Sequence, residues 1–123
     1  MKSASRLEPN ELANADGGQL SGRCVLIVED DPFISLDLDE LLKSVGVRVI
    51  GPVPTVDAAL RLLGTSKPHA AVLDLNLRGE RSTPIAVALQ AEEIPFVLVS
   101  GYSRSQIDEP IFDDAPLVPK PVQ

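Results

Sequence analysis

Side chains that could do chemistry follow four short apolar runs of this 123-residue chain. The first run ends at Glu29 and Asp30, the third at Asp74, the fourth at Ser100, and the fifth is followed by Lys120. If these runs are neighbouring parallel strands, the side chains gather at one edge of the sheet, because such strands all end on the same side. The pattern therefore predicts a site with three carboxylates, a hydroxyl and an amine.

Three carboxylates in one crevice repel one another, so they favour a bound cation. Oxygen ligands select a hard ion, and Mg²⁺ suits a site with few carboxylates and retained waters. A carboxylate can also act as a nucleophile toward a phosphoryl group, while Mg²⁺ and a lysine offset the transferred charge and a hydroxyl donates a further hydrogen bond. These residue types predict Mg²⁺-dependent phosphoryl transfer onto an aspartate.

The elements that must position these side chains alternate between strands and helices. This alternation predicts a parallel sheet with right-handed crossovers, and hence a three-layer α/β domain. Prolines at positions 52 and 54 place the second strand at an edge, since proline has no backbone N–H to donate to a neighbouring strand. Strands are expected at residues 24–28, 47–53, 70–73, 96–99 and 117–118, and helices at 33–45, 55–63 and 83–90.

Helix starts are marked by capping residues. Asp31 before Pro32 is expected to cap the first helix, and Thr55 the second. The third helix is expected to open with a cap and with Pro84 at its first position.

Composition limits the function classes. The formal charge of −7 argues against direct contact with nucleic acid, because no basic stripe is available to displace counterions from phosphates. No apolar run approaches the ~20 residues that cross a bilayer, so we expect no membrane contact and a cytoplasmic protein. Residues 1–22 are polar and glycine-rich toward their end, and are expected to form a flexible tail or linker before one domain at 23–123.

Four motifs resemble, in order, those of response-regulator receiver domains of the CheY-like superfamily. They are Val-Glu-Asp-Asp-Pro at 28–32, Leu-Asp-Leu-Asn at 73–76, Val-Ser-Gly at 99–101 and Pro-Lys-Pro at 119–121. The resemblance covers about residues 23 to 122. It implies a flavodoxin-like three-layer sandwich with a five-stranded parallel sheet in the order 2-1-3-4-5.

The resemblance also implies a role for each site residue. Asp74 would be the phosphoacceptor, Lys120 would bind the phosphoryl group, and Ser100 would be the switch hydroxyl. The donor would be a sensor histidine kinase or a phosphotransfer protein, and the chain would be a signalling domain, not an enzyme acting on other molecules.

A Mg²⁺ ion would be held by four groups if the resemblance holds. Asp30 and Asp74 would be direct ligands, Glu29 would act through water, and Asn76 would offer its backbone carbonyl. The Lys120–Pro121 peptide is expected to be cis, because the lysine must turn back sharply over the strand end.

Two departures from the receiver pattern stand out. Leu117 occupies the place where receivers commonly carry an aromatic switch residue, and Tyr102 is a candidate replacement for it. The fifth helix of receivers is missing from this chain, which stops at Gln123. Either the chain is truncated before this helix, or another chain completes that face, as in a homodimer.

The stretch from 102 to 115, where receivers place a fourth helix, is expected to be a short helix or disordered. Proline inside a helix costs ~3 kcal/mol, so Pro110 limits any helix before it to about one turn. With few apolar anchors, the segment should lie at the low-stability end of the fold, and phosphorylation is expected to order it.

Two other functions use similar residues. A haloacid-dehalogenase-like phosphatase also combines an Asp nucleophile with Mg²⁺, a hydroxyl and a lysine, but its acidic pair comes late, and here Asn76 leaves no general acid two residues after Asp74. A receiver-like binding module that is never phosphorylated usually lacks the acceptor or the lysine, and both are present here.

Overall fold

The computed structural model describes residues 22–120 and contains a five-stranded parallel sheet at its centre. The strand order is β2-β1-β3-β6-β7, and every neighbouring pair is parallel. This confirms the predicted order 2-1-3-4-5 and places the proline-containing strand at an edge. The strands are β1 (Cys24–Val28), β2 (Arg48–Val53), β3 (Ala70–Asp74), β6 (Phe96–Ser100) and β7 (Leu117–Pro119).

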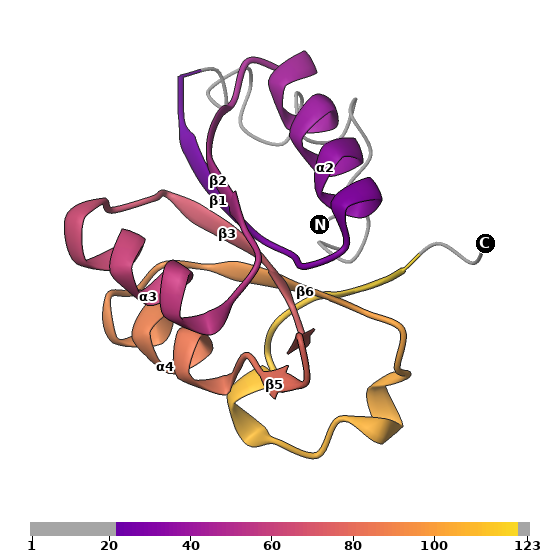
Figure 1. The fold of residues 1–123 in the computed structure, drawn as a ribbon. Coiled ribbons are helices and arrows are strands. Elements are labelled where there is room, and N and C mark those ends of the chain that lie inside the picture. The colour runs from indigo at the N-terminus through magenta and orange to yellow at the C-terminus, as the bar shows by residue number, and fades with distance from the viewer. Residues whose placement is uncertain (1–21, 121–123) are drawn as a thin grey trace, which may run out of the picture.

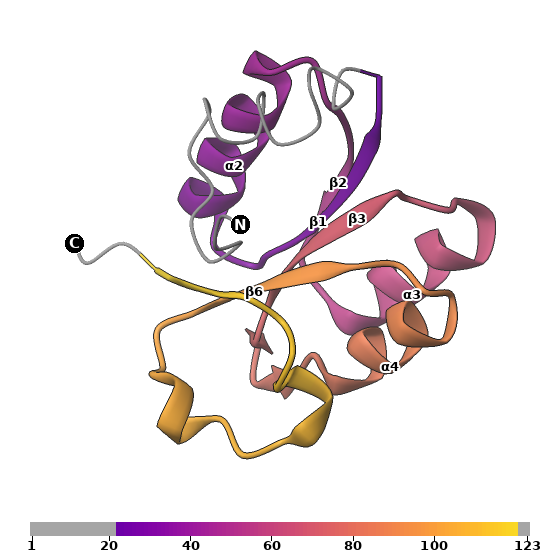
Figure 2. The same ribbon diagram turned by 180° about the vertical axis from the view of Figure 1, so that it is seen from behind.

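Helices cover both faces of the sheet. Helix α2 (Pro32–Ser44) lies on one face, and α3 (Val56–Thr65) and α4 (Thr83–Ala91) lie on the other (Figures 1 and 2). The first two predicted caps are confirmed. Asp31 Oδ1 accepts hydrogen bonds from the first turn of α2, and Thr55 Oγ1 accepts one from the first turn of α3.

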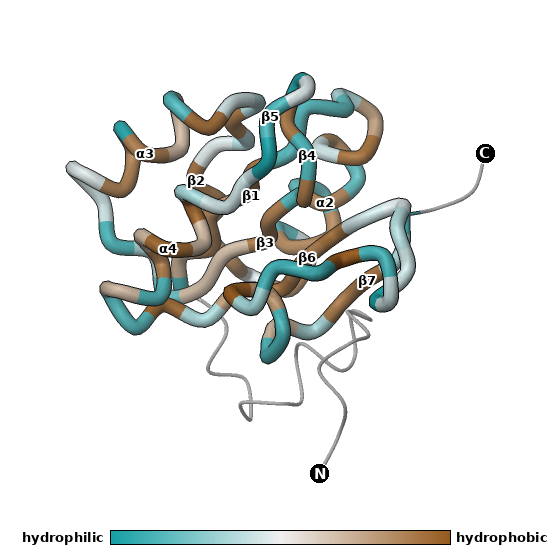
Figure 3. The backbone as a smooth tube through the Cα atoms, turned by 90° about the horizontal axis from the view of Figure 1, so that it is seen from below, coloured by the Kyte–Doolittle hydropathy of each residue, from teal (hydrophilic) through white to brown (hydrophobic). Residues whose placement is uncertain are grey.

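Alternate residues of the central strands belong to two hydrophobic clusters, because successive side chains of a strand point to opposite faces. Leu26 and Leu73 belong to the larger cluster, which α3 and α4 cover. Ile27 and Val72 belong to the smaller one, beneath α2. Figure 3 shows hydrophobic backbone segments gathered toward the centre and hydrophilic ones in the surrounding turns.

Helix α2 is only partly covered. Its apolar residues recur at helical spacing, yet Leu42 is the one that is buried, while Phe33 is 77% and Leu36 is 53% exposed. In the described part of the chain α2 is the only α-helix on its face of the sheet, so nothing there covers its far flank. A groove of about 200 Å³ runs beside it, lined by Ile34, Asp37, Leu38, Leu41, Val99, Val118 and Pro119.

A short antiparallel hairpin follows β3, and the sequence analysis did not anticipate it. Strand β4 (Asn76–Leu77) pairs with β5 (Glu80–Arg81) through a two-residue turn. Both turn residues have positive φ, 52° at Arg78 and 82° at Gly79. Such a turn matches the right-handed twist of the flanking strands, and glycine at its second position adopts this conformation without strain.

Two single 3₁₀ turns replace a fourth helix, which confirms that no long helix forms between residues 102 and 115. They are η1 (Arg104–Gln106) and η2 (Pro110–Phe112), and Pro110 opens the second. The segment is nevertheless packed onto the domain. Phe112 is fully buried, and its ring meets that of Phe96 edge to face at 6.5 Å between centroids.

Two sequence-based expectations concern residues that the structure does not describe. The predicted tail lies outside the described residues except for Gly22, and so does Pro121, on which the predicted cis bond depends. Among the residues the structure does describe, none of the helices is long and apolar enough to cross a membrane.

Candidate functional site

Four predicted site residues meet at the carboxyl edge of the sheet. Glu29 and Asp30 follow β1, Asp74 ends β3, and Lys120 follows β7. One carboxylate oxygen from each of the three acids lies within 4.8 Å of the other two. Lys120 Nζ lies 3.0 Å from Asp74 Oδ2 and 3.3 Å from Glu29 Oε2. The strands that the sequence predicted as neighbours therefore bring these charges together.

Burial makes this cluster electrostatically costly. Glu29 is 3% and Asp74 is 2% exposed, because both stand at the ends of the two central strands. Glu29 Oε2 accepts a hydrogen bond from the backbone N–H of Asp31 as well as from Lys120. Glu29 Oε1 is buried and has no hydrogen-bond partner. A buried, unpartnered carboxylate oxygen is a costly group that a cation would satisfy.

These residues fit a hard divalent cation. Three carboxylates outnumber the single lysine among them, and all their free donor atoms are oxygens, which Mg²⁺ prefers. Asn76, whose backbone carbonyl is the fourth predicted ligand, begins β4 two residues after Asp74.

The hairpin holds Asp30 at the edge of this cluster. The backbone N–H of Arg78, in the turn, donates a hydrogen bond of 3.0 Å to Asp30 Oδ2. Burial alone would raise the pKa of Asp30, but the bond from Arg78 and further bonds with Asp74 and Glu29 outweigh it and lower that pKa. Asp30 is therefore ionised at neutral pH and ready to bind a cation.

The pKa of Asp74 is shifted in the opposite direction, upward. Burial raises its pKa to about 8, the hydrogen bond and negative charge of Glu29 add to that rise, and Lys120 opposes it. Burial lowers the pKa of Lys120, but its contacts with Asp74 and Glu29 raise it further, so the lysine stays charged. Burial and Glu29 thus favour the protonated form of Asp74, whereas Lys120 and a bound cation favour the ionised form.

Stability should therefore depend on the ionisation of Asp74. The unfolded chain ionises this residue above pH 3.8, but the metal-free folded state does so only near pH 8. The contribution of Asp74 to the free energy of unfolding therefore decreases as the pH rises from 3.8 to about 8. In EDTA, Asp74→Asn is expected to raise Tm by several degrees above pH 8, with a smaller gain near pH 4. Calorimetry across this range checks it, and an identical Tm for both proteins at every pH would contradict it.

The Ser100 hydroxyl lies at the same edge, but its hydrogen-bond partner is outside the carboxylate cluster. Ser100 ends β6 and is 2% exposed, and its Oγ accepts a hydrogen bond of 2.9 Å from the backbone N–H of Tyr102. The Tyr102 side chain is 44% exposed, and its ring centroid lies 6.0 Å from the guanidinium carbon of Arg81. Leu117 is partly buried in β7 and packs on the larger core cluster. Of the two switch candidates, Tyr102 is linked to Ser100 through its backbone N–H, and Leu117 lies in the neighbouring strand β7.

A second polar cluster was missed by the sequence analysis. Glu109 accepts a hydrogen bond from the Thr83 hydroxyl and forms an ion pair of 3.2 Å with Arg81 Nε. The cap expected at the start of the third helix is absent, because the N-cap residue is Ser82 and its side chain makes no capping bond. Nothing in the sequence links position 109 to positions 81 and 83, so only the folded chain reveals this contact.

Comparison with known proteins identifies relatives along most of the chain. No family model matches it. The phyllosphere-induced regulator PhyR of Methylorubrum extorquens is 31% identical over 102 residues, covering 80% of this chain and 38% of PhyR. The chain thus spans well under half the length of that regulator.

Solved structures resemble both the sequence and the fold. The BeF3-activated conformation of SdrG from Pseudomonas melonis Fr1 is 42% identical with a TM-score of 0.69, covering 81% of this chain and 85% of SdrG. The PhyR response regulator REC domain of Erythrobacter litoralis is 27% identical with a TM-score of 0.71, covering 85% and 72%. With the predicted sheet order and the carboxylate cluster beside a lysine, these likenesses show that the chain belongs to the receiver domains of response regulators.

Proposed function

We propose that this receiver domain accepts a phosphoryl group on Asp74 in a Mg²⁺-dependent reaction, with a sensor histidine kinase or phosphotransfer protein as the donor. The observation that carries the proposal is the 3.0 Å contact of Lys120 Nζ with Asp74 Oδ2 inside a cluster of three carboxylates. The BeF3-activated conformation of the relative SdrG supports it. The protein would act in the cytoplasm and switch the binding of a partner.

Each site residue has a distinct part in this proposal. The ionised carboxylate of Asp74, which Lys120 favours, attacks phosphorus, and the bond between phosphorus and the donor's histidine nitrogen breaks as the new O–P bond forms. Glu29, Asp30, Asp74 and the Asn76 carbonyl would hold Mg²⁺, which when bound would offset negative charge on the transferred group. Lys120 stays charged and offsets charge on the other side of the phosphoryl group.

Incubation with acetyl phosphate tests the proposal, because this small donor needs no kinase. Intact-mass measurement is expected to show one added phosphoryl group in the presence of Mg²⁺ and none in EDTA. Unmodified protein under both conditions would refute the proposal and favour a binding module that is never phosphorylated.

Phosphorylation is expected to slow amide exchange in residues 103–115. Within this segment the backbone hydrogen bonds are those of isolated single turns, such as Ile107 N–H to Arg104 O at 3.1 Å, which open readily. We propose that the Ser100 hydroxyl leaves the Tyr102 N–H, turns toward the acyl phosphate and orders the segment. Hydrogen exchange with and without a beryllofluoride mimic measures this, and β3 amides serve as the control. Strong protection in the unmodified protein, or no change with the mimic, would refute it.

We further propose that the open face beside α2 forms a homodimer. Phe33 and Leu36 are exposed on α2, and an apolar groove runs beside the same helix, so a two-fold axis can place this apolar surface of one copy against that of the other. Sedimentation equilibrium is expected to show a dimer that Leu36→Asp converts to monomer. A wild-type chain that stays monomeric at high micromolar concentration would exclude this dimer.

A further inference from the structure

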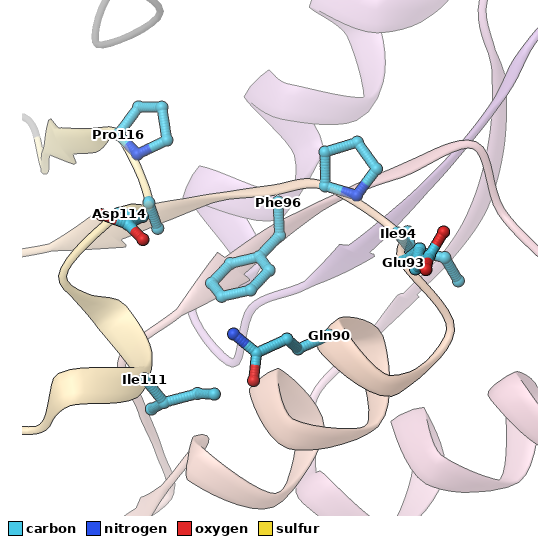
Figure 4. Close-up of a pocket in the computed structure, with 9 residues that line it drawn as sticks. Gln90, Glu93, Ile94, Phe96, Ile111, Asp114 and Pro116 are labelled. Atoms are coloured by element: carbon cyan, nitrogen blue, oxygen red, sulfur yellow. The ribbon is translucent and has the colours of Figure 1, made fainter.

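A second pocket, of about 440 Å³, opens at the amino edge of the sheet, away from Asp74. Its walls come from the end of α4, the start of β6, and η2 with the turn that follows it. Figure 4 shows the Phe96 ring at the centre, with Gln90 and Ile111 beside it and with Glu93 and Asp114 at opposite ends. Ile94, Pro95, Ala115 and Pro116 complete the lining.

Hydrogen bonds and aromatic packing hold the η2 wall of the pocket in place. The Arg104 guanidinium donates one hydrogen bond of 2.8 Å to the backbone carbonyl of Phe112 and another of 2.6 Å to that of Ala115. The buried Phe112 ring also packs edge to face on Phe96, which forms the centre of the pocket. These contacts shape the η2 wall of the pocket.

Glu93, at one end of the pocket, stands where glycine would be more stable. Its φ of 58° is left-handed, and it follows the last turn of α4 in a glycine-type helix end, with hydrogen bonds from Glu93 N–H to Gln90 O and from Ile94 N–H to Leu89 O. A carboxylate at a helix carboxyl end is also disfavoured by the helix dipole. Within the described residues its side chain makes no hydrogen bond or ion pair, so no contact there offsets this cost.

Asp114 is a second acidic residue, at the opposite end of the pocket from Glu93. It too is exposed and has no basic partner among residues 22–120. The pocket thus has an apolar centre, formed by Phe96, Ile111 and Pro116, between two unpaired negative charges. A ligand that fits needs a large apolar group with positive charge on both sides.

We propose that this pocket docks a partner protein through an exposed segment in which one large apolar side chain is flanked by lysine or arginine. A buried apolar anchor surrounded by a charged rim is the common anatomy of a small protein interface. The unpaired carboxylates of Glu93 and Asp114 favour a basic partner at this pocket. The site shares no residue with the phosphoacceptor cluster, so the two proposals can fail separately.

Titration of the ¹⁵N-labelled full chain with the tripeptide acetyl-Arg-Phe-Arg-amide tests the proposal. Saturable NMR shifts are expected at the amides of residues 90–96 and 111–115, with a Kd of about 1 mM for so small a probe. Acetyl-Glu-Phe-Glu-amide, which reverses the charge, and acetyl-Arg-Gly-Arg-amide, which lacks the anchor, are each expected to bind at least about fivefold more weakly. Equal binding of the acidic peptide, or shifts confined to the Asp74 edge, would overturn it.

Two variants and a matched control complete the test. Glu93→Gly and Asp114→Asn are each expected to weaken binding of acetyl-Arg-Phe-Arg-amide about threefold. Glu93→Gly should also keep or raise Tm, because glycine suits the left-handed position, so weaker binding cannot come from unfolding. Asp57→Asn, which removes an exposed acid of α3 paired with Arg61, is expected to bind as the wild type does. Unchanged affinity in both pocket variants would overturn the proposal.

Discussion

Asp74→Asn is expected to gain no phosphoryl group from acetyl phosphate and Mg²⁺ under conditions in which the wild-type chain gains one. The amide nitrogen and oxygen of asparagine keep the shape of the side chain but cannot form the acyl phosphate. Asp74 is 2% exposed and its Oδ2 lies 3.0 Å from Lys120 Nζ, while Glu29, the other buried acid of the cluster, lies 3.3 Å from the same amine. Intact-mass spectrometry measures the result directly.

Two further variants sharpen this prediction. Lys120→Ala is expected to slow the initial rate of phosphorylation by about 10²–10³-fold, the usual loss when one preorganised charge-stabilising donor is removed. Asp57→Asn, on the exposed surface of α3, controls for nonspecific modification and should react like the wild type. Modification of Asp74→Asn to the wild-type extent would remove Asp74 from the role of phosphoacceptor.

Asp30→Ala is expected to weaken Mg²⁺ binding by more than about 100-fold, because a direct ligand should matter more than an outer-shell partner, whose loss costs about 10–100-fold. Asp30 has a lowered pKa and is thus available as a charged ligand at neutral pH. Its removal also leaves the Arg78 N–H without its acceptor. Isothermal titration calorimetry with MgCl₂ measures the affinity.

The adjacent acid provides a matched control. Asp31→Ala removes the cap of α2, whose Oδ1 accepts hydrogen bonds from Phe33 and Ile34, and should cost about 0.5–2 kcal/mol of stability. It should leave the Mg²⁺ affinity unchanged, because the carboxylate oxygen that clusters with Glu29 and Asp74 belongs to Asp30. Equal Mg²⁺ affinity in Asp30→Ala and the wild type would exclude Asp30 from the coordination shell.

Much of the carboxylate cluster around Asp74 could be predicted from the sequence because its position follows from strand geometry. Runs such as Cys24–Val28 are buried on both faces, so each must be a central strand, and the residue that ends it must lie at the carboxyl edge. Right-handed crossovers then leave few possible sheet orders. Glu29, Asp74 and Lys120 were placed together on these grounds, and the structure brings them within hydrogen-bond distance.

Contacts between segments without such periodicity could not be predicted. The turn at Arg78 has no apolar pattern, yet its N–H reaches Asp30 across the fold. The hydroxyl of Thr83, the first residue of α4, donates a hydrogen bond to Glu109, because the tertiary fold brings that carboxylate within reach. Helical spacing likewise could not show that Phe33 stays exposed, since burial depends on what packs against α2.

The sequence by itself thus determined the parallel sheet and the residues collected at its carboxyl edge, because these depend on local periodicity and on the common direction of parallel strands, and the resemblance to receiver domains implied the strand order. The tertiary structure alone decided how those residues are charged and what surrounds them. Burial between the central strands raises the pKa of Asp74, and the packing of Phe112 and Arg104 builds the second pocket. Both effects arise from long-range packing and desolvation, which no local pattern of residues encodes.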